Sequence, residues 1–210
     1  MATYSSIRYN FPVVNSSTSS QIGAGAMKLI KTLTADEDAN LSLVGGSSDV
    51  VLDNTYRTYI IKYINMHPET DSGYFQFSVS TDGGSNYGIA TTSTGFRAAH
   101  TEDGTTHASL AYDTSYDLSQ ETGAQTLKYA VGGPSANDAC GSGELWLFNP
   151  SQTTYVKHFL NVSNGERGDA ICFNDYTAGY FNTTSAINAL QFSFNNGDID
   201  AGTIKLYGIA

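Results

Sequence analysis

The chain has 210 residues and a formal net charge of −10, with 20 acidic against 10 basic side chains. An acidic surface repels phosphate backbones, so nucleic acid is not an expected partner. No run approaches the roughly 20 apolar residues of a membrane helix, so no membrane insertion is expected. Aromatic residues make up 12% of the chain while Glu, Lys and Leu are sparse, a balance that favours an all-β fold.

The first 25 residues differ in character from everything that follows. The stretch VNSSTSSQIGAGA is polar, rich in small residues and without periodicity, which is typical of a linker or extended arm. The segment before it is more aromatic than a disordered tail, with Tyr4, Ile7, Tyr9, Phe11, Val13 and Val14. Residues 1–25 are therefore predicted to form an extended N-terminal arm that packs on its own domain, on a sister subunit or on a larger assembly. The arm lacks the apolar centre of a signal peptide, so secretion by the usual route is not expected.

From Ala26 onward, short runs of β-branched and aromatic residues alternate with turn signals. In GYFQFSVST, Phe75, Phe77 and Val79 face one way, and the following DGGSN is a strong hairpin signal. Strands are expected at 26–34, 55–66, 73–81, 94–100, 108–113, 125–131, 143–150, 153–162, 170–181, 187–194 and 202–209. With no long amphipathic helix and no internal repeat, the pattern predicts one antiparallel β-sandwich, jelly-roll-like, over residues 26–210.

The last two strands carry a prediction of their own. Leu190, Phe192 and Phe194 share one face, as do Ile204 and Leu206 in the final strand. The short connection NNGDIDAG between the two strands predicts that they form a hairpin. The final strand runs almost to residue 210, so it is expected to be a core strand that ties the C-terminus into the sheet.

The titratable residues do not form a recognisable catalytic or metal-binding pattern. His100 and His107 flank a loop-like stretch, but their spacing matches no zinc motif. Paired carboxylates fall in predicted turns, where Asp serves as a turn former; the pairs that a glycosidase could use are Glu102/Asp103 and Asp198/Asp200. The second pair also lacks the full calcium-loop spacing, and no serine lies in a nucleophile elbow. We therefore expect no enzymatic activity, no metal and no cofactor.

The two cysteines, Cys140 and Cys172, are far apart in the sequence. Two free and mostly buried thiols are expected for a protein made in a reducing compartment, with one disulfide as the alternative. Neither has a second Cys or His at ligand spacing, which argues against a metal pair.

Four aromatic side chains lie close to Asn, Asp and Gly in the second half of the chain: Trp146, Tyr176, Tyr180 and Phe181. Aromatic rings beside such polar residues bind sugars by stacking combined with hydrogen bonds. These four are therefore the candidate glycan contacts. The alternative is that they fill the core or a subunit interface.

Several segments share their order with a known family: YIIKYINMHPETD (59–71), STDGGSNY (80–87), GELWLFNPSQTTYVKHF (143–159), YTAGYFNTTSAINALQFSF (176–194) and GDIDAGTIKLYGI (197–209). In this combination, which covers most of residues 23–209, the chain resembles small structural proteins of tailed bacteriophages, particularly those of marine hosts. The resemblance implies a lectin-like β-sandwich displayed on the virion as a tail or fibre component or as a surface decoration. It implies no catalytic residues.

A short arm joined to one acidic domain, without a coiled-coil or β-helical shaft, suits a capsid decoration (cement) protein or a small tail appendage. The expected partners are further copies of the chain in a homotrimer and the major capsid protein or tail proteins. The expected location is the virion surface, after assembly in the host cytoplasm. Two other hypotheses remain: a carbohydrate-binding module that recognises host-surface glycans, and a glycan-cleaving enzyme that uses the carboxylate pairs named above.

Overall fold

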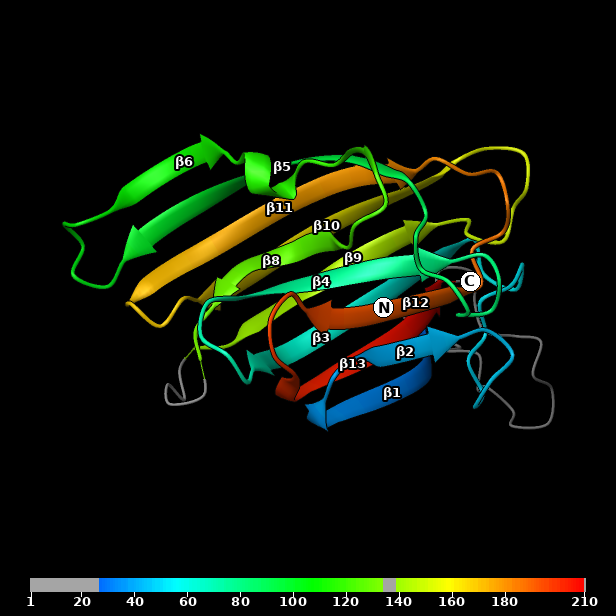
Figure 1. Cartoon of the computed structure of the whole chain (residues 1–210), viewed down its shortest axis with the longest axis horizontal. Helices are drawn as coiled ribbons and strands as arrows, with labels where there is room; N and C mark the ends of the chain where they lie inside the picture. The colour runs from blue at the N-terminus through cyan, green and yellow to red at the C-terminus, as the bar shows by residue number, and fades with distance from the viewer. Residues whose placement is uncertain (1–26, 134–138, 210) are drawn as a thin grey trace, which may run out of the picture.

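The computed structural model describes residues 27–133 and 139–209. Within these residues, thirteen strands and one short 3-10 helix form two antiparallel sheets that pack against each other, which confirms the predicted β-sandwich (Figure 1). The predicted arm, with Tyr4, Ile7, Tyr9, Phe11, Val13 and Val14, lies outside the described residues.

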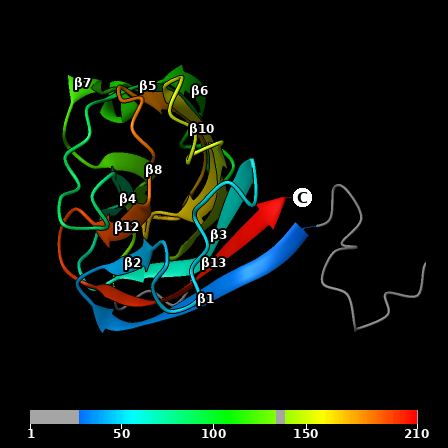
Figure 2. The ribbon, with the colours of Figure 1, turned by 90° about the vertical axis from the view of Figure 1, so that its right-hand side faces the viewer.

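The larger sheet has the strand order β1-β13-β3-β9-β10-β11-β5-β6, and the short strand β7 also pairs with β5. It bends around the smaller sheet, as Figure 2 shows. Its strands are β1 (Met27–Asp38), β3 (Thr58–Pro68), β5 (Thr91–Thr101), β6 (Ala108–Tyr112), β7 (Ser119–Glu121), β9 (Gly141–Phe148), β10 (Lys157–Glu166), β11 (Ile171–Phe181) and β13 (Ile199–Ile209).

The smaller sheet has the order β2-β12-β4-β8. Its strands are β2 (Leu41–Val44), β4 (Gly73–Ser80), β8 (Gln125–Val131) and β12 (Ala189–Phe194). The helix η1 (Thr114–Tyr116) lies between β6 and β7 in the chain, and its first turn is capped by the Asp113 carboxylate, which accepts from the Ser115 N–H.

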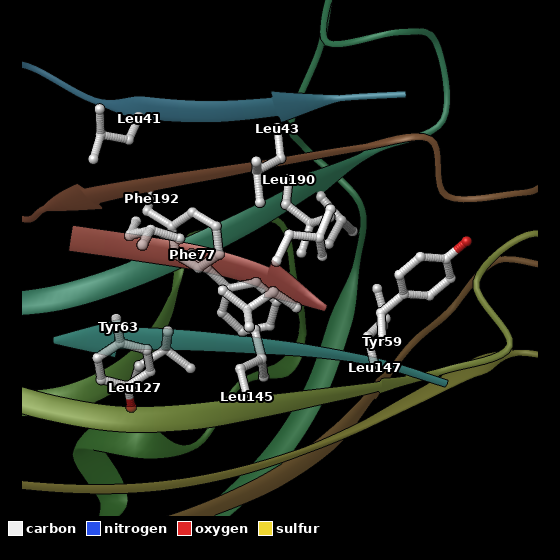
Figure 3. Close-up of a cluster of buried hydrophobic side chains, with 14 of the residues drawn as sticks. Leu41, Leu43, Tyr59, Tyr63, Phe77, Leu127, Leu145, Leu147, Leu190 and Phe192 are labelled. Carbon is white, nitrogen blue, oxygen red and sulfur yellow. The ribbon is translucent and has the colours of Figure 1, made fainter. Parts of the chain in front are cut away.

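The main core lies between the two sheets, where the alternating strands present their apolar faces to each other (Figure 3). Phe77 of β4 is 1% exposed, and its ring centroid lies 5.3 Å from that of Phe159, 5.8 Å from that of Phe181 and 6.3 Å from that of Phe192. Phe159 and Phe181 come from the larger sheet and Phe192 from the smaller one. One aromatic cluster therefore joins the two layers.

The predicted hairpin between the last two strands is wrong. β12 pairs with β2 and β4 in the smaller sheet, whereas β13 pairs with β1 and β3 in the larger sheet. Residues 195–198 cross from one layer to the other. Leu190 and Leu206 belong to the same buried cluster because the two strands face each other across the core instead of lying side by side. The prediction that the final strand lies in the core is confirmed.

The hairpin expected at DGGSN is also wrong, because β4 lies in the smaller sheet and β5 in the larger one. The strand expected at 153–162 is displaced, since β10 spans Lys157–Glu166. β1 continues through the acidic stretch that was expected to be a turn, because Asp36 and Asp38 pair with Ala201 and Ile199 of β13 while their charges stay at the surface. β2 and β7 were not predicted. Each is short, with four and three residues, and too brief to show a clear alternation.

Candidate functional site

The outer face of the larger sheet, formed by β5, β6, β10 and β11, is apolar although it faces solvent. Along β10 the buried side chains include Asn161 and Ser163, while the solvent side carries Leu160 and Val162, which are 50% and 37% exposed. On β6, Leu110 is 74% exposed. Contiguous apolar patches on a protein surface mark binding sites for other molecules.

A groove crosses this face at a small residue. Leu160, Ala178 and Thr94 lie side by side on β10, β11 and β5. Because Ala178 is short, a hollow of about 290 Å³ opens above it, lined on one side by Phe96 and Tyr176. A second hollow of about 370 Å³ continues across the same three residues and reaches His158 of β10 and Tyr180 of β11. We call these two hollows together the outer groove.

Aromatic rings form both walls of the outer groove. Phe96 and Tyr176 stack with their ring centroids 4.9 Å apart and an angle of 7° between the ring planes. On the other side, the ring centroids of His158 and Tyr180 lie 5.9 Å apart. The side chains that line the groove include no Asp, Glu, Lys or Arg. The groove therefore offers shape and apolar area without fixed charge.

The structure brings together three of the four predicted glycan contacts. Tyr176 and Tyr180 line the outer groove, and Trp146 of β9 lies beside Leu160 on the same face, where its Nε1 donates to Glu144 Oε1 at 3.0 Å. Phe181 is a correction: it is 1% exposed because it follows Tyr180 by one residue and so points to the opposite face, into the core. It cannot contact a ligand in solvent.

Phe96, Leu160 and Tyr112 also belong to this surface and were not predicted from the sequence. A signal was nevertheless present in β10, where residues 159–163 alternate so that Asn161 and Ser163 share a face with Phe159. Two polar residues on the face of a core aromatic indicate that the interior at this end is polar. The apolar residues between them must then face outward.

The interior behind the outer groove holds a polar network between the sheets. Lys128 of β8 and Asp175 of β11 are both fully buried, with Nζ and Oδ2 3.2 Å apart. The hydroxyl of Tyr116 donates to Asp175 Oδ1 at 2.6 Å. Nearby, the hydroxyl of Tyr63 donates to Asn161 Oδ1 at 2.6 Å, and Asn161 Nδ2 donates to the Leu127 carbonyl at 2.8 Å.

Burial sets the protonation behaviour of this network. Desolvation raises the pKa of Tyr63 and of Tyr116 well above the usual value, so both phenols remain neutral donors. Desolvation also lowers the pKa of Lys128, and the nearby Asp175 carboxylate opposes that effect. We call Lys128, Asp175 and Tyr116 the buried triad.

A separate, polar hollow of about 320 Å³ lies at one end of the sandwich, where β4 and β8 meet the turn after β10. Its lining includes Tyr74 and Tyr129, whose rings stack with centroids 4.6 Å apart, together with Asp71, Arg167 and Asp169. Arg167 pairs with Asp169, and this contact lowers the pKa of the Asp169 carboxyl. The hollow thus combines aromatic faces with charged hydrogen-bonding groups.

Among the other titratable residues that were singled out, Asp103 and Asp200 have local partners. The Asp103 carboxylate accepts from the Thr105 and Thr106 N–H groups at 2.9 and 3.0 Å, and hydroxyl and N–H donors hold its pKa well below its usual value. His67 Nδ1 lies 3.0 Å from Asp200 Oδ2. Over residues 27–133 and 139–209, no group of three or more His, Cys, Asp or Glu side chains could hold a metal ion. Cys172 is an exposed free thiol, so the expectation of a mostly buried thiol is wrong at this position.

Comparison with known proteins does not add a further constraint. No protein-family model, curated protein or solved structure matches the chain. In the described part of the chain, no helix has the length and apolar character needed to cross a membrane. The outer groove, the polar hollow and the buried triad are therefore the features that bear on function.

Proposed function

We propose that the chain is a structural component of a tailed-phage virion, a capsid decoration protein or a small tail appendage, whose outer groove packs against further copies of itself. The observation that carries the proposal is the apolar outer groove, whose lining side chains include no Asp, Glu, Lys or Arg. The family resemblance of residues 23–209 supports the virion setting. The aromatic residues of the arm support an attachment role for residues 1–25 toward the major capsid protein or tail proteins. No enzymatic role is proposed.

The net charge of the chain indicates how a second copy would approach the outer groove. Each chain carries a formal net charge of −10, so two copies repel each other over most of their surfaces. Repulsion is weakest where neither surface has a fixed charge, and the lining of the outer groove has none from Asp, Glu, Lys or Arg. A contact in which this face of one copy packs against the next copy, repeated around a threefold axis to close a homotrimer, buries the apolar side chains with the smallest electrostatic cost.

Substitution of Leu160 by Lys is expected to convert the assembled protein into monomers. The new charge would lie in the centre of the groove and would be desolvated by contact with a second copy, so we expect association to weaken by about 30-fold or more. Sedimentation velocity over a concentration series measures the change, and circular dichroism checks that the variant is folded.

The matched control is Tyr155→Lys. Tyr155 is also strongly exposed, at 73%, but it does not line the outer groove. The control should assemble like the parent chain. A parent chain that is monomeric at tens of micromolar, or equal assembly of the Leu160 variant and the parent, would contradict the proposal.

The polar hollow favours a second candidate function, the binding of host-surface glycans. Sugar sites combine aromatic faces with a few polar groups, and Tyr74 and Arg167 provide both. The outer groove has aromatic walls but few hydrogen-bonding groups, so the polar hollow is the better glycan site of the two.

A glycan array with the purified chain tests this second candidate. Tyr74→Ala should weaken binding by about tenfold because an aromatic ring that lines the hollow is lost. Trp146→Ala, on the outer face, should leave binding unchanged. If no glycan on a broad array binds the parent chain, or if only the Trp146 variant loses binding, the polar hollow is not a glycan site.

A further inference from the structure

The buried triad contains an amine and a carboxylate that are held together away from water. The side chains of Lys128 and Asp175 have no exposed area, and their Nζ and Oδ2 atoms are 3.2 Å apart. The lysine stem lies against glycines of the larger sheet: a Cβ added at Gly165 would fall 2.7 Å from Lys128 Cε, and one at Gly141 would fall 3.1 Å from Lys128 Cγ. These glycines leave the space through which the amine reaches the carboxylate.

Burial disfavours the charged form of Lys128, because desolvation lowers the pKa of its amine. Two buried charges lose their hydration, and their mutual attraction repays that loss only in part. Transfer of one proton from the ammonium to the carboxylate removes both charges. It leaves a neutral amine, which is a nucleophile, beside a neutral carboxylic acid.

The remaining contacts orient these two groups for reaction. Lys128 Nζ donates to the Tyr129 carbonyl at 2.7 Å, which fixes the position of the nitrogen. Tyr116 donates to Asp175 Oδ1 at 2.6 Å, and this is the oxygen on which negative charge develops when the carboxyl carbon is attacked. Oδ2, on the lysine side, is then the leaving oxygen. The Ser163 hydroxyl lies 3.3 Å from Oδ2.

We propose that Lys128 and Asp175 condense spontaneously to an isopeptide bond between the two sheets. In the step, Nζ bonds to the Asp175 carboxyl carbon and the bond from that carbon to Oδ2 breaks. Two of the three ammonium protons leave on Oδ2 as one water molecule, and the third remains on the amide nitrogen. The reaction needs no oxidant, reductant or other co-reactant. A neutral amide replaces two buried charges, and fixed proximity replaces a bimolecular encounter.

The bond would link β8 of the smaller sheet to β11 of the larger one. Such a link holds together two layers that otherwise associate through side-chain packing, and it restricts the unfolded chain between residues 128 and 175. It does not depend on the assembly role proposed above, because the triad lies on the inner face of β11 and the outer groove lies on the other face.

The mass of the full chain, measured after denaturation, tests the proposal directly. The linked chain should be lighter than its sequence mass by about 18 Da, one water molecule. Trypsin should fail to cleave after Lys128 and should release residues 98–157 joined to residues 168–205. A folded chain with its full sequence mass, or a loss of water that maps to other residues, overturns the proposal. This measurement needs no variant.

Three substitutions separate the reaction from a simple ion pair. Lys128→Arg keeps the positive charge beside Asp175 but has no nucleophilic amine, so its mass should equal the sequence mass. Tyr116→Phe removes the donor on Oδ1 and should slow bond formation by about 10²–10³-fold, followed as the unlinked fraction with time after synthesis. Lys157→Arg is the control, since Lys157 is also buried but donates to the Tyr155 and Thr183 carbonyls, and it should keep the mass loss.

Discussion

Removal of residues 203–210 is expected to abolish the folded state. These residues form most of β13, which pairs with β1 on one side and with β3 on the other. Without them β1 loses its partner strand, and the buried side chains of Ile204 and Leu206 leave the core. Each such loss costs about 2–5 kcal/mol, and a domain has a total stability of about 5–15 kcal/mol, so the shortened chain should not fold.

Urea denaturation followed by circular dichroism measures this effect, and the shortened chain should show no cooperative transition. The matched control removes residues 1–22, which precede β1 in the chain. That chain should unfold like the parent but should no longer decorate purified virions, as the arm is the proposed attachment segment. A cooperative transition in the chain without residues 203–210 would contradict the central position of β13.

Phe77→Ala is expected to have the largest effect of any single substitution considered for this protein. The ring is 1% exposed and contacts Phe159 and Phe181 of the larger sheet and Phe192 of the smaller one. Loss of a buried phenyl ring leaves a cavity and costs about 3–5 kcal/mol in the free energy of unfolding. The urea midpoint should fall by roughly 1–2 M.

Phe96→Ala makes the same chemical change on the other face of the larger sheet. Phe96 is 45% exposed, and its main contact is the stack with Tyr176. Its loss should therefore lower the free energy of unfolding by about 0.5–1.5 kcal/mol. If the two variants lost equal stability, the assignment of inner and outer faces would be wrong.

The sequence determined the class of fold and the position of most strands. Strict alternation in residues 73–80, with Phe75, Phe77 and Val79 on one face, predicts a half-buried strand whatever its partners are. The same local reasoning located β11 and β13 to within three residues of their observed ends. Turn residues between the runs marked the connections, because their backbone preferences are local as well.

The sequence did not determine which strands are neighbours. The pattern of Leu190 and Phe192 is the same whether Ile204 and Leu206 lie beside them in one sheet or opposite them in the other. Both arrangements bury the same faces, and a short connection allows both. The choice depends on contacts between distant segments, such as β13 with β1, which a period-two pattern does not contain.

The candidate sites show the same division. Aromatic and polar composition identified Trp146, Tyr176 and Tyr180 as residues with surface roles to be tested, but Phe181 appeared equivalent to them until the pairing of β11 placed it in the core. The buried triad is formed by Tyr116, Lys128 and Asp175, which lie on different elements of the chain. Composition and alternation are local and are readable from the sequence, whereas burial and proximity arise only when the two sheets pack, so only the tertiary structure decided them.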